Sequence, residues 1–214
     1  MARDDERRAR AQEDVLVGGL PDVPGISAAM RLTPGLGVHL RGLADELLVH
    51  DFPGATIHRH ERELLATAVS AANDCFFSMD SHGAFAHALL ERNGGTALAP
   101  VIDVVKAGSS DGLDPKMQAL LHIARTVQRS PRGLSPTDVA AAQDAGASDG
   151  DVQLAVLIAA AFSMYNRMVD GLGARTPPTT EGYGARAAEI AEHGYSAPSK
   201  LGPPPAPAGA PSRG

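Results

Sequence analysis

Four side chains with catalytic potential fall close together in the sequence: Glu63, Cys75, Ser78 and His82. Cys75 is the single cysteine among 214 residues. Each residue of an α-helix advances by about 100°, so positions three and seven apart share a face. We therefore expect Cys75, Ser78 and His82 to line one stripe of a helix, with a thiol, a hydroxyl and an imidazole facing the same side.

The position of Cys75 after Asn73 and Asp74 predicts thiol chemistry. Both preceding residues favour helix caps, so Cys75 is expected in the first turn of a helix. Unpaired backbone N–H groups and the helix dipole there favour a thiolate, the nucleophilic form of cysteine. His82, two turns further on, would exchange a proton with it through water or an intermediate side chain. Glu63, on the preceding helix, would approach the pair if the two helices pack side by side.

The same residues also have an ordinary structural interpretation. A lone cysteine in an Ala-rich helix is usually a small buried hydrophobe. A lone histidine is more often a satisfied or solvent-facing residue than a catalyst. The spacing alone leaves both interpretations of Cys75 and His82 open.

The elements that must position these side chains are predicted to be helices. The composition is 43% hydrophobic and only 4% aromatic, so Ala and Leu fill most of the core, which favours close-packed helices. Asp114-Pro115 and Ser135-Pro136 each place a capping side chain before a proline, a helix-start signal. Helical periodicity predicts helices over about 35–50, 56–72, 75–93, 115–129, 136–145, 152–168 and 181–193.

No convincing alternating strand pattern interrupts these helices, so the predicted fold class is an all-α, single-domain helical bundle. We expect a charged tail over residues 1–19 and a helical domain over 20–196. Residues 197–214 are rich in Pro, Ala and Gly and are predicted to be a disordered tail.

Composition argues against several classes of partner. The formal net charge of −6 gives no nucleic-acid footprint. No stretch reaches the roughly 18 apolar residues of a membrane helix, and no signal peptide is visible. A single cysteine allows no internal disulfide and fits a reducing compartment, so a cytoplasmic protein is expected.

Motifs for a cofactor or metal are also missing from the sequence. There is no Gly-rich phosphate loop or dinucleotide fingerprint, so no cofactor is expected. His58 and His60 point about 200° apart on a helix and cannot chelate a metal together there. Asn166, Arg167 and Asp170 interrupt an apolar helix, and we expect hydrogen bonds between helices or subunits from them.

The pattern of Glu63, Cys75, Ser78 and His82 resembles the signature of the alkylhydroperoxidase D and carboxymuconolactone decarboxylase superfamily: a Glu, then Cys-x-x-Cys, then a His. The segments RHERELLATAVSAANDCFFSMDSHGAFA, PGISAAMRLTPGLGVHLRGLADELL and AAAFSMYNRMVDGLG are similar to the core helices, upstream segment and later helix of its peroxidase-related branch. The resemblance covers about residues 20–195. It implies an all-helical protein that assembles into homo-oligomers, usually trimers or hexamers.

The resemblance also implies roles for the four residues. In peroxidase members the second cysteine attacks the hydroperoxide, the first resolves it as a disulfide, and a Glu–water–His relay activates the thiols. Glu63 and His82 match the relay, and Cys75 matches the first cysteine. Ser78 stands where the second cysteine belongs, and a hydroxyl cannot form a disulfide. Phe77 replaces a position that is histidine in some members.

Three functions are compatible with a serine, Ser78, at the position of the second cysteine. The first is a peroxidase-like, antioxidant oxidoreductase that reduces a hydroperoxide through Cys75 alone, with an external thiol as reductant. The second is a non-redox enzyme of the decarboxylase type, in which Glu63 or His82 acts as acid or base on a small carboxylated or lactone substrate and Ser78 orients it. The third is a catalytically silent scaffold for binding or oligomerisation.

Overall fold

The computed structural model describes residues 15–95, 98–177 and 180–197, and no strand occurs within these ranges. The predicted all-α class is confirmed. The α-helices are α2 (Ile26–Leu32), α3 (Pro34–Leu48), α4 (Arg59–Ala72), α5 (Phe76–Arg92), α6 (Ala99–Lys106), α7 (Pro115–Arg129), α8 (Pro136–Asp144), α9 (Asp149–Gly171) and α10 (Gly184–His193), with short 3-10 turns at Pro131–Gly133 and Thr180–Tyr183.

Side-chain caps set several helix starts. The Asp114 carboxylate accepts the Met117 N–H, and Ser135 closes a capping box with Asp138, so α7 and α8 begin at the predicted prolines. Ser148 forms another capping box with Asp151. This box starts α9 three residues before the predicted boundary.

Two other predicted boundaries are wrong. The second helix was expected from about Thr56, but α4 begins at Arg59, because His58 is its cap and the His58 N–H is held by the Glu61 carboxylate at 2.6 Å. The last helix begins at Gly184, after a 3-10 turn. The short helices α2 and α6 were not predicted.

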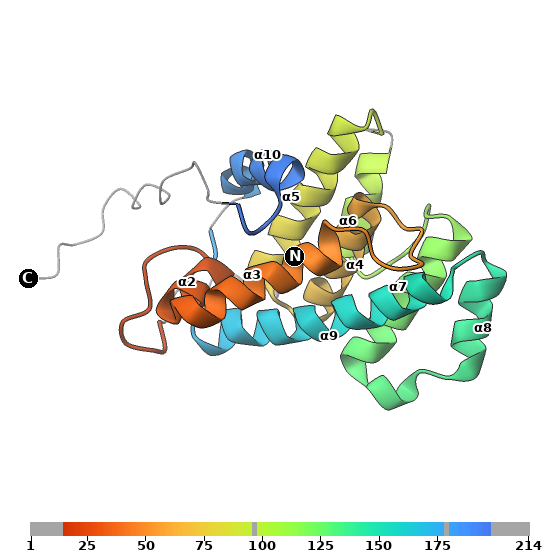
Figure 1. Ribbon diagram of the computed structural model, residues 1–214, viewed down its shortest axis with the longest axis horizontal. Coiled ribbons are helices and arrows are strands. Elements are labelled where there is room, and N and C mark those ends of the chain that lie inside the picture. The colour runs from red at the N-terminus through yellow and green to blue at the C-terminus, as the bar shows by residue number, and fades with distance from the viewer. Residues whose placement is uncertain (1–14, 96–97, 178–179, 198–214) are drawn as a thin grey trace, which may run out of the picture.

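The α4–α5 pair and α9 form the centre of the fold. Helices α4 and α5 pack against each other along their lengths, and α9 packs on α4 and α7. Figure 1 shows α3 and α9 side by side across the near face, with α10 next to α5 at the upper edge. Leu65, Leu154, Ile158 and Phe162 are almost wholly buried where these helices meet. The site residues of α4 and α5 therefore project into a closed interior.

By length and composition α9 could cross a membrane, with a mean hydropathy of 1.4 over its most apolar stretch. Half of that stretch is buried inside the protein. The core helix of a globular domain has this composition too, since it is covered on several sides. Contacts of α9 with α2, α3, α4, α7 and α8 account for its apolar character.

A buried carboxylate ties the start of α9 to the segment before α4. Asp151 is fully buried and accepts the backbone N–H groups of Thr56 (2.6 Å) and Ile57 (3.0 Å) and the Thr56 hydroxyl (2.7 Å). Gly150 allows the close approach, because a Cβ atom there would lie 2.3 Å from the carbonyl carbon of Gly54. This junction fixes the entry of the chain into α4.

The predicted tails fall largely outside the described residues, which exclude 1–14 and 198–214. Residues 15–19 are described, and the Leu16 N–H donates to the carbonyl of Leu172 at 3.2 Å. The division into tail, domain and tail therefore stays a prediction.

Candidate active site

Glu63 and His82 form a buried pair between α4 and α5. Glu63 Oε2 lies 2.6 Å from His82 Nδ1, and the relative exposures of the two residues are 0% and 8%. Side-by-side packing of α4 and α5 thus brings the carboxylate to the imidazole, as expected. The Tyr195 hydroxyl donates to the other carboxylate oxygen, Glu63 Oε1, at 2.6 Å.

The hydrogen bonds assign protons within this group. Each oxygen of Glu63 has one donor, an arrangement suited to an ionised carboxylate. We therefore assign the His82 proton to Nδ1, since that nitrogen faces Glu63. The described protein residues make no hydrogen bond to His82 Nε2, so this nitrogen has a free lone pair. Such a histidine, oriented by a carboxylate, can take up and return a proton.

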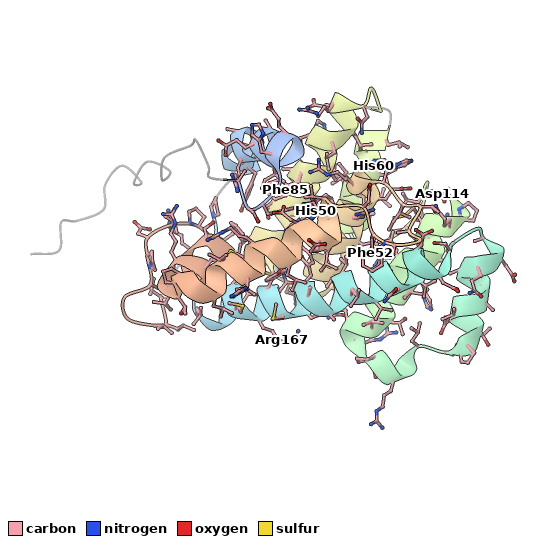
Figure 2. All side chains as sticks on the ribbon, viewed as in Figure 1. His50, Phe52, His60, Phe85, Asp114 and Arg167 are labelled. Atoms are coloured by element: carbon pink, nitrogen blue, oxygen red, sulfur yellow. The ribbon has the colours of Figure 1, made fainter. Side chains whose placement is uncertain are left out.

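Aromatic rings enclose the imidazole of His82. Phe162 and Phe85 meet it edge to face, with centroid distances of 4.6 and 5.2 Å, and Tyr195 stacks on it at 6.0 Å. Figure 2 labels Phe85 where α5 approaches α10. About 10% of the His82 side chain is exposed. The walls exclude most water, which strengthens electrostatic interactions inside the site.

Tyr195 was not predicted as a site residue. Its ring is partly exposed, but its hydroxyl is buried against Glu63. Burial raises the pKa of Tyr195 well above its ordinary value, and the negative charge of Glu63 raises it further. Tyr195 therefore stays protonated and acts as a hydrogen-bond donor. It follows α10 directly and lies 132 positions from Glu63, so no local pattern connects the two residues.

Cys75 occupies a different environment. It is the N-cap residue of α5, after the break at Asp74, whose φ is 57°. It is fully buried in an apolar cluster with Val23, Ala28, Val169 and Ala174. In the described part of the chain, no hydrogen bond joins Cys75 to Glu63 or His82. Cys75 therefore packs in its own apolar cluster and is not directly hydrogen-bonded to the Glu63–His82 pair in the described residues.

The expected lowering of the Cys75 pKa is wrong. Burial raises the pKa of the thiol, and the negative charge of the neighbouring Asp170 raises it further. A hydrogen bond with the Ser78 backbone lowers the pKa of Cys75, but by less than burial and Asp170 raise it. Removal from water disfavours the thiolate more than the start of the helix favours it.

Ser78 belongs to a buried hydrogen-bond network. Its hydroxyl lies 2.9 Å from that of Ser70, which also accepts the Asn166 side-chain N–H at 3.2 Å. Asn73 donates to Asn166 Oδ1 at 2.8 Å, and Gln128 donates to Asn73 Oδ1 at 2.8 Å. The expected interhelical role of Asn166 is confirmed, because these bonds join α9 to α4. Arg167 instead bonds within its own helix, to the Ser163 carbonyl.

A hollow of about 410 Å³ lies at the outer end of this network, lined by Asn73, Asn166, Arg167, Asp170 and Gly171. Figure 2 labels Arg167 on α9 there. Neither Glu63 nor His82 lines it. The polar contacts between α4 and α5 thus have two parts, the Glu63–His82–Tyr195 group and the Ser70–Ser78–Asn166 network.

Metal-ligand clusters do not appear in the described residues, where no group of three or more His, Cys, Asp or Glu side chains could hold an ion. His58 and His60 stack on each other, with a centroid distance of 5.8 Å. Burial lowers the pKa of His60.

Comparison with solved structures places this helical arrangement among known folds. A crystal structure of the alkylhydroperoxidase AhpD core of an uncharacterized peroxidase-related protein from Ralstonia eutropha JMP134 superposes with a TM-score of 0.63 at 24% identity, covering 77% of this chain and 81% of that one. This chain has the alkylhydroperoxidase D-like fold. An uncharacterized peroxidase-related protein from Silicibacter sp. TM1040 gives a TM-score of 0.61 at 19% identity over 82% and 94% of the two chains. No protein-family model and no curated protein matches the sequence.

Proposed function

We propose that this alkylhydroperoxidase D-like protein is an enzyme that performs acid–base chemistry at Glu63 and His82. One observation carries the proposal: a buried carboxylate lies 2.6 Å from Nδ1 of a buried imidazole whose Nε2 has no hydrogen-bond partner among the described residues. Buried carboxylates can be purely structural, as Asp151 is, but a structural histidine would usually use both ring nitrogens in hydrogen bonds. Among the described residues His82 uses only Nδ1, which favours catalysis over the silent scaffold.

Each residue has a defined task in this mechanism. His82 Nε2 accepts a proton from the substrate or returns one to it. Glu63 holds the Nδ1–H tautomer and stabilises the imidazolium that forms when Nε2 is protonated. Ser78 lies one helical turn before His82 on the same face of α5, where its hydroxyl can orient a ligand.

The proposed substrate is a small carboxylated molecule or lactone. Proton removal next to a carbonyl and decarboxylation both require a base or acid near the reacting carbon and need no thiol. The burial of Cys75, together with the raised pKa of its thiol, supports this choice over chemistry at the cysteine.

Proton NMR in D₂O tests the proposal without a known substrate. Small keto acids and lactones are incubated with the protein, and deuterium uptake at carbon, decarboxylation and ring opening are followed. We expect turnover that is retained in Cys75→Ala and falls about 100-fold or more in His82→Gln. Turnover that survives in His82→Gln contradicts the assignment.

The second candidate is a peroxidase-like reaction at Cys75, favoured by the description of both structural neighbours as peroxidase-related. The Cys75 thiolate would attack a hydroperoxide oxygen, and the leaving alkoxide would take a proton through His82 to give an alcohol. Cys75 would be left as a sulfenic acid. Two external thiols would then restore Cys75 and form a disulfide and water.

Consumption of an alkyl hydroperoxide in the presence of dithiothreitol tests this second function. Loss of turnover in Cys75→Ser supports it, and unchanged turnover in that variant excludes it. This second function also assumes a cytoplasmic location, where the pool of small thiols would supply the reductant. It further assumes that the chain forms a homo-oligomer. The acid–base reaction should survive in Cys75→Ala and be lost in His82→Gln. The peroxidase-like reaction should instead be lost in Cys75→Ala.

A further inference from the structure

The turn after α10 is held by a buried carboxylate of α3. Asp45 is 6% exposed, and its two oxygens accept the backbone N–H groups of Tyr195 (2.6 Å) and Ser196 (2.9 Å). Gly194, with φ of +77°, brings the chain around. A Cβ atom at Gly194 would lie 2.7 Å from Asp45 Oδ1, so a larger residue there would push the carboxylate away.

Arg59 holds the same segment from the other side. Its guanidinium donates to the carbonyls of Ala191 (2.9 Å) and Ile190 (3.0 Å), at the C-terminal end of α10. Positive charge at this end of a helix also complements the helix dipole. Arg59 begins α4, the helix that carries Glu63 one turn later. Two charged residues therefore fix the turn relative to the site.

The consequence of this double attachment is the placement of Tyr195. Its hydroxyl donates to Glu63 Oε1 at 2.6 Å and lies 3.3 Å from His82 Nδ1, and its ring stacks on His82 with an interplanar angle of 25°. With Oε1 bound to Tyr195, the carboxylate cannot rotate freely, and Oε2 stays on His82 Nδ1.

We propose that Tyr195 and Asp45 are positioning residues of the site, which set the tautomer of His82. The inference rests on the proposed acid–base function, because that function requires Nε2 to be free. The centre is then a group of three side chains from α4, α5 and the turn after α10, one of which, Tyr195, is not among the four residues that the sequence indicates.

The test measures the tautomer itself. Nitrogen–proton NMR correlations distinguish an Nδ1–H imidazole, an Nε2–H imidazole and the doubly protonated imidazolium. We expect the Nδ1–H form of His82 to dominate in the native protein. In Tyr195→Phe and Asp45→Asn the Nε2–H form should increase by about fivefold or more, because Glu63 loses its fixed orientation.

Tyr165→Phe is the matched control. Its hydroxyl is also buried and donates a hydrogen bond, to the Leu40 carbonyl at 2.8 Å, but it does not touch Glu63. The tautomer of His82 should be unchanged in this variant. If Asp45→Asn does not fold, Tyr195→Phe decides alone, since it removes only one oxygen.

An unchanged His82 tautomer in Tyr195→Phe would overturn the inference. With a substrate in hand, the same variant should lower kcat about tenfold and leave KM within about twofold. A tautomer shift without any change in turnover supports the positioning of His82 by Tyr195 and refutes the proposed function. A failure of the positioning inference is thus distinguishable from a failure of the proposed acid–base function.

Discussion

At the scale of single residues, Glu63 is the group on which the others depend. It is fully buried, yet both its oxygens are satisfied, by His82 and Tyr195. A buried charge is tolerated when strong hydrogen bonds replace those of water. Removing the carboxylate would take away the shared acceptor of two buried groups, whose remaining contact is the 3.3 Å approach of the Tyr195 hydroxyl to His82 Nδ1.

Glu63→Ala should therefore be destabilising, by about 3 kcal/mol in the free energy of unfolding. Urea denaturation followed by circular dichroism measures this. Glu46→Ala is the control, since Glu46 is exposed and pairs only with His50 on the surface of α3. It should change stability by less than about 0.5 kcal/mol. Equal effects of the two substitutions would refute the importance of the buried hydrogen bonds.

Cys75 should react slowly in the folded protein. Its thiol is fully buried and its pKa is raised, so little accessible thiolate exists at neutral pH. With a chromogenic disulfide reagent at about pH 8, labelling in the native state should be at least 100-fold slower than in urea. Equally fast labelling in both states would show an accessible thiol and favour the peroxidase-like function.

Part of this site could be predicted from the sequence. Glu63 and His82 lie on consecutive helices, both predicted from helical periodicity. Their approach follows from the packing of these two neighbouring helices. Tyr195 and Asp45 are 150 positions apart, and their contact depends on the path of the whole chain. The pKa of Cys75 was predicted wrongly, because a helix-start argument contains no information about burial.

At the scale of elements, side-chain caps explain part of what could be predicted, since α3, α5 and α10 follow from periodicity without such a cap. Helices α7, α8 and α9 begin at Asp114, Ser135 and Ser148, whose side chains accept a backbone N–H of the first turn. The two missed helices, α2 and α6, have no side-chain cap at their starts. They are also short, with 7 and 8 residues, so their periodicity is weak.

The Asp151 junction between α9 and the segment before α4 should make stability depend on pH. Burial alone would raise the pKa of Asp151, but hydrogen bonds from Thr56, Ser148 and Ile57 lower it below its ordinary value. A carboxyl whose folded pKa is lowered contributes stability above its unfolded pKa, about 3.9. That contribution is lost as the pH falls through the folded value.

Asp151→Asn should accordingly cost about 3 kcal/mol at pH 7 and progressively less below about pH 4. Urea midpoints at both pH values measure the difference. Asp149→Asn provides the comparison, because Asp149 is exposed and accepts only from the Gln143 side chain. A loss of stability in Asp151→Asn that is independent of pH would contradict this account.

At the scale of the whole molecule, some large apolar side chains on α3 and α9 face outward. Leu36 and Leu43 on α3 are 48% and 38% exposed, and Leu157 and Met164 on α9 are 38% and 39% exposed. Figure 1 shows these two helices next to each other. The homo-oligomer implied by the resemblance would cover side chains of this kind.

Sedimentation equilibrium should give a mass three or six times that of the 22.1 kDa chain. Leu157→Asp should reduce the mass to that of one chain, because a charge in an apolar interface is costly. Leu98→Asp is the comparison, since Leu98 is similarly exposed, at 47%, before α6. A single-chain mass for the unaltered protein would refute the predicted assembly.

The attachment of Tyr195 also determines the order in which the site forms in time. Glu63 and His82 are 19 positions apart on consecutive helices, whereas Tyr195 is 132 positions from Glu63. Short-range contacts close early during folding, and contacts between distant segments close later. We therefore expect the acid–base pair to form during refolding before Tyr195 reaches it. If Tyr195 sets the tautomer of His82 as proposed, helix content should recover before the native tautomer does.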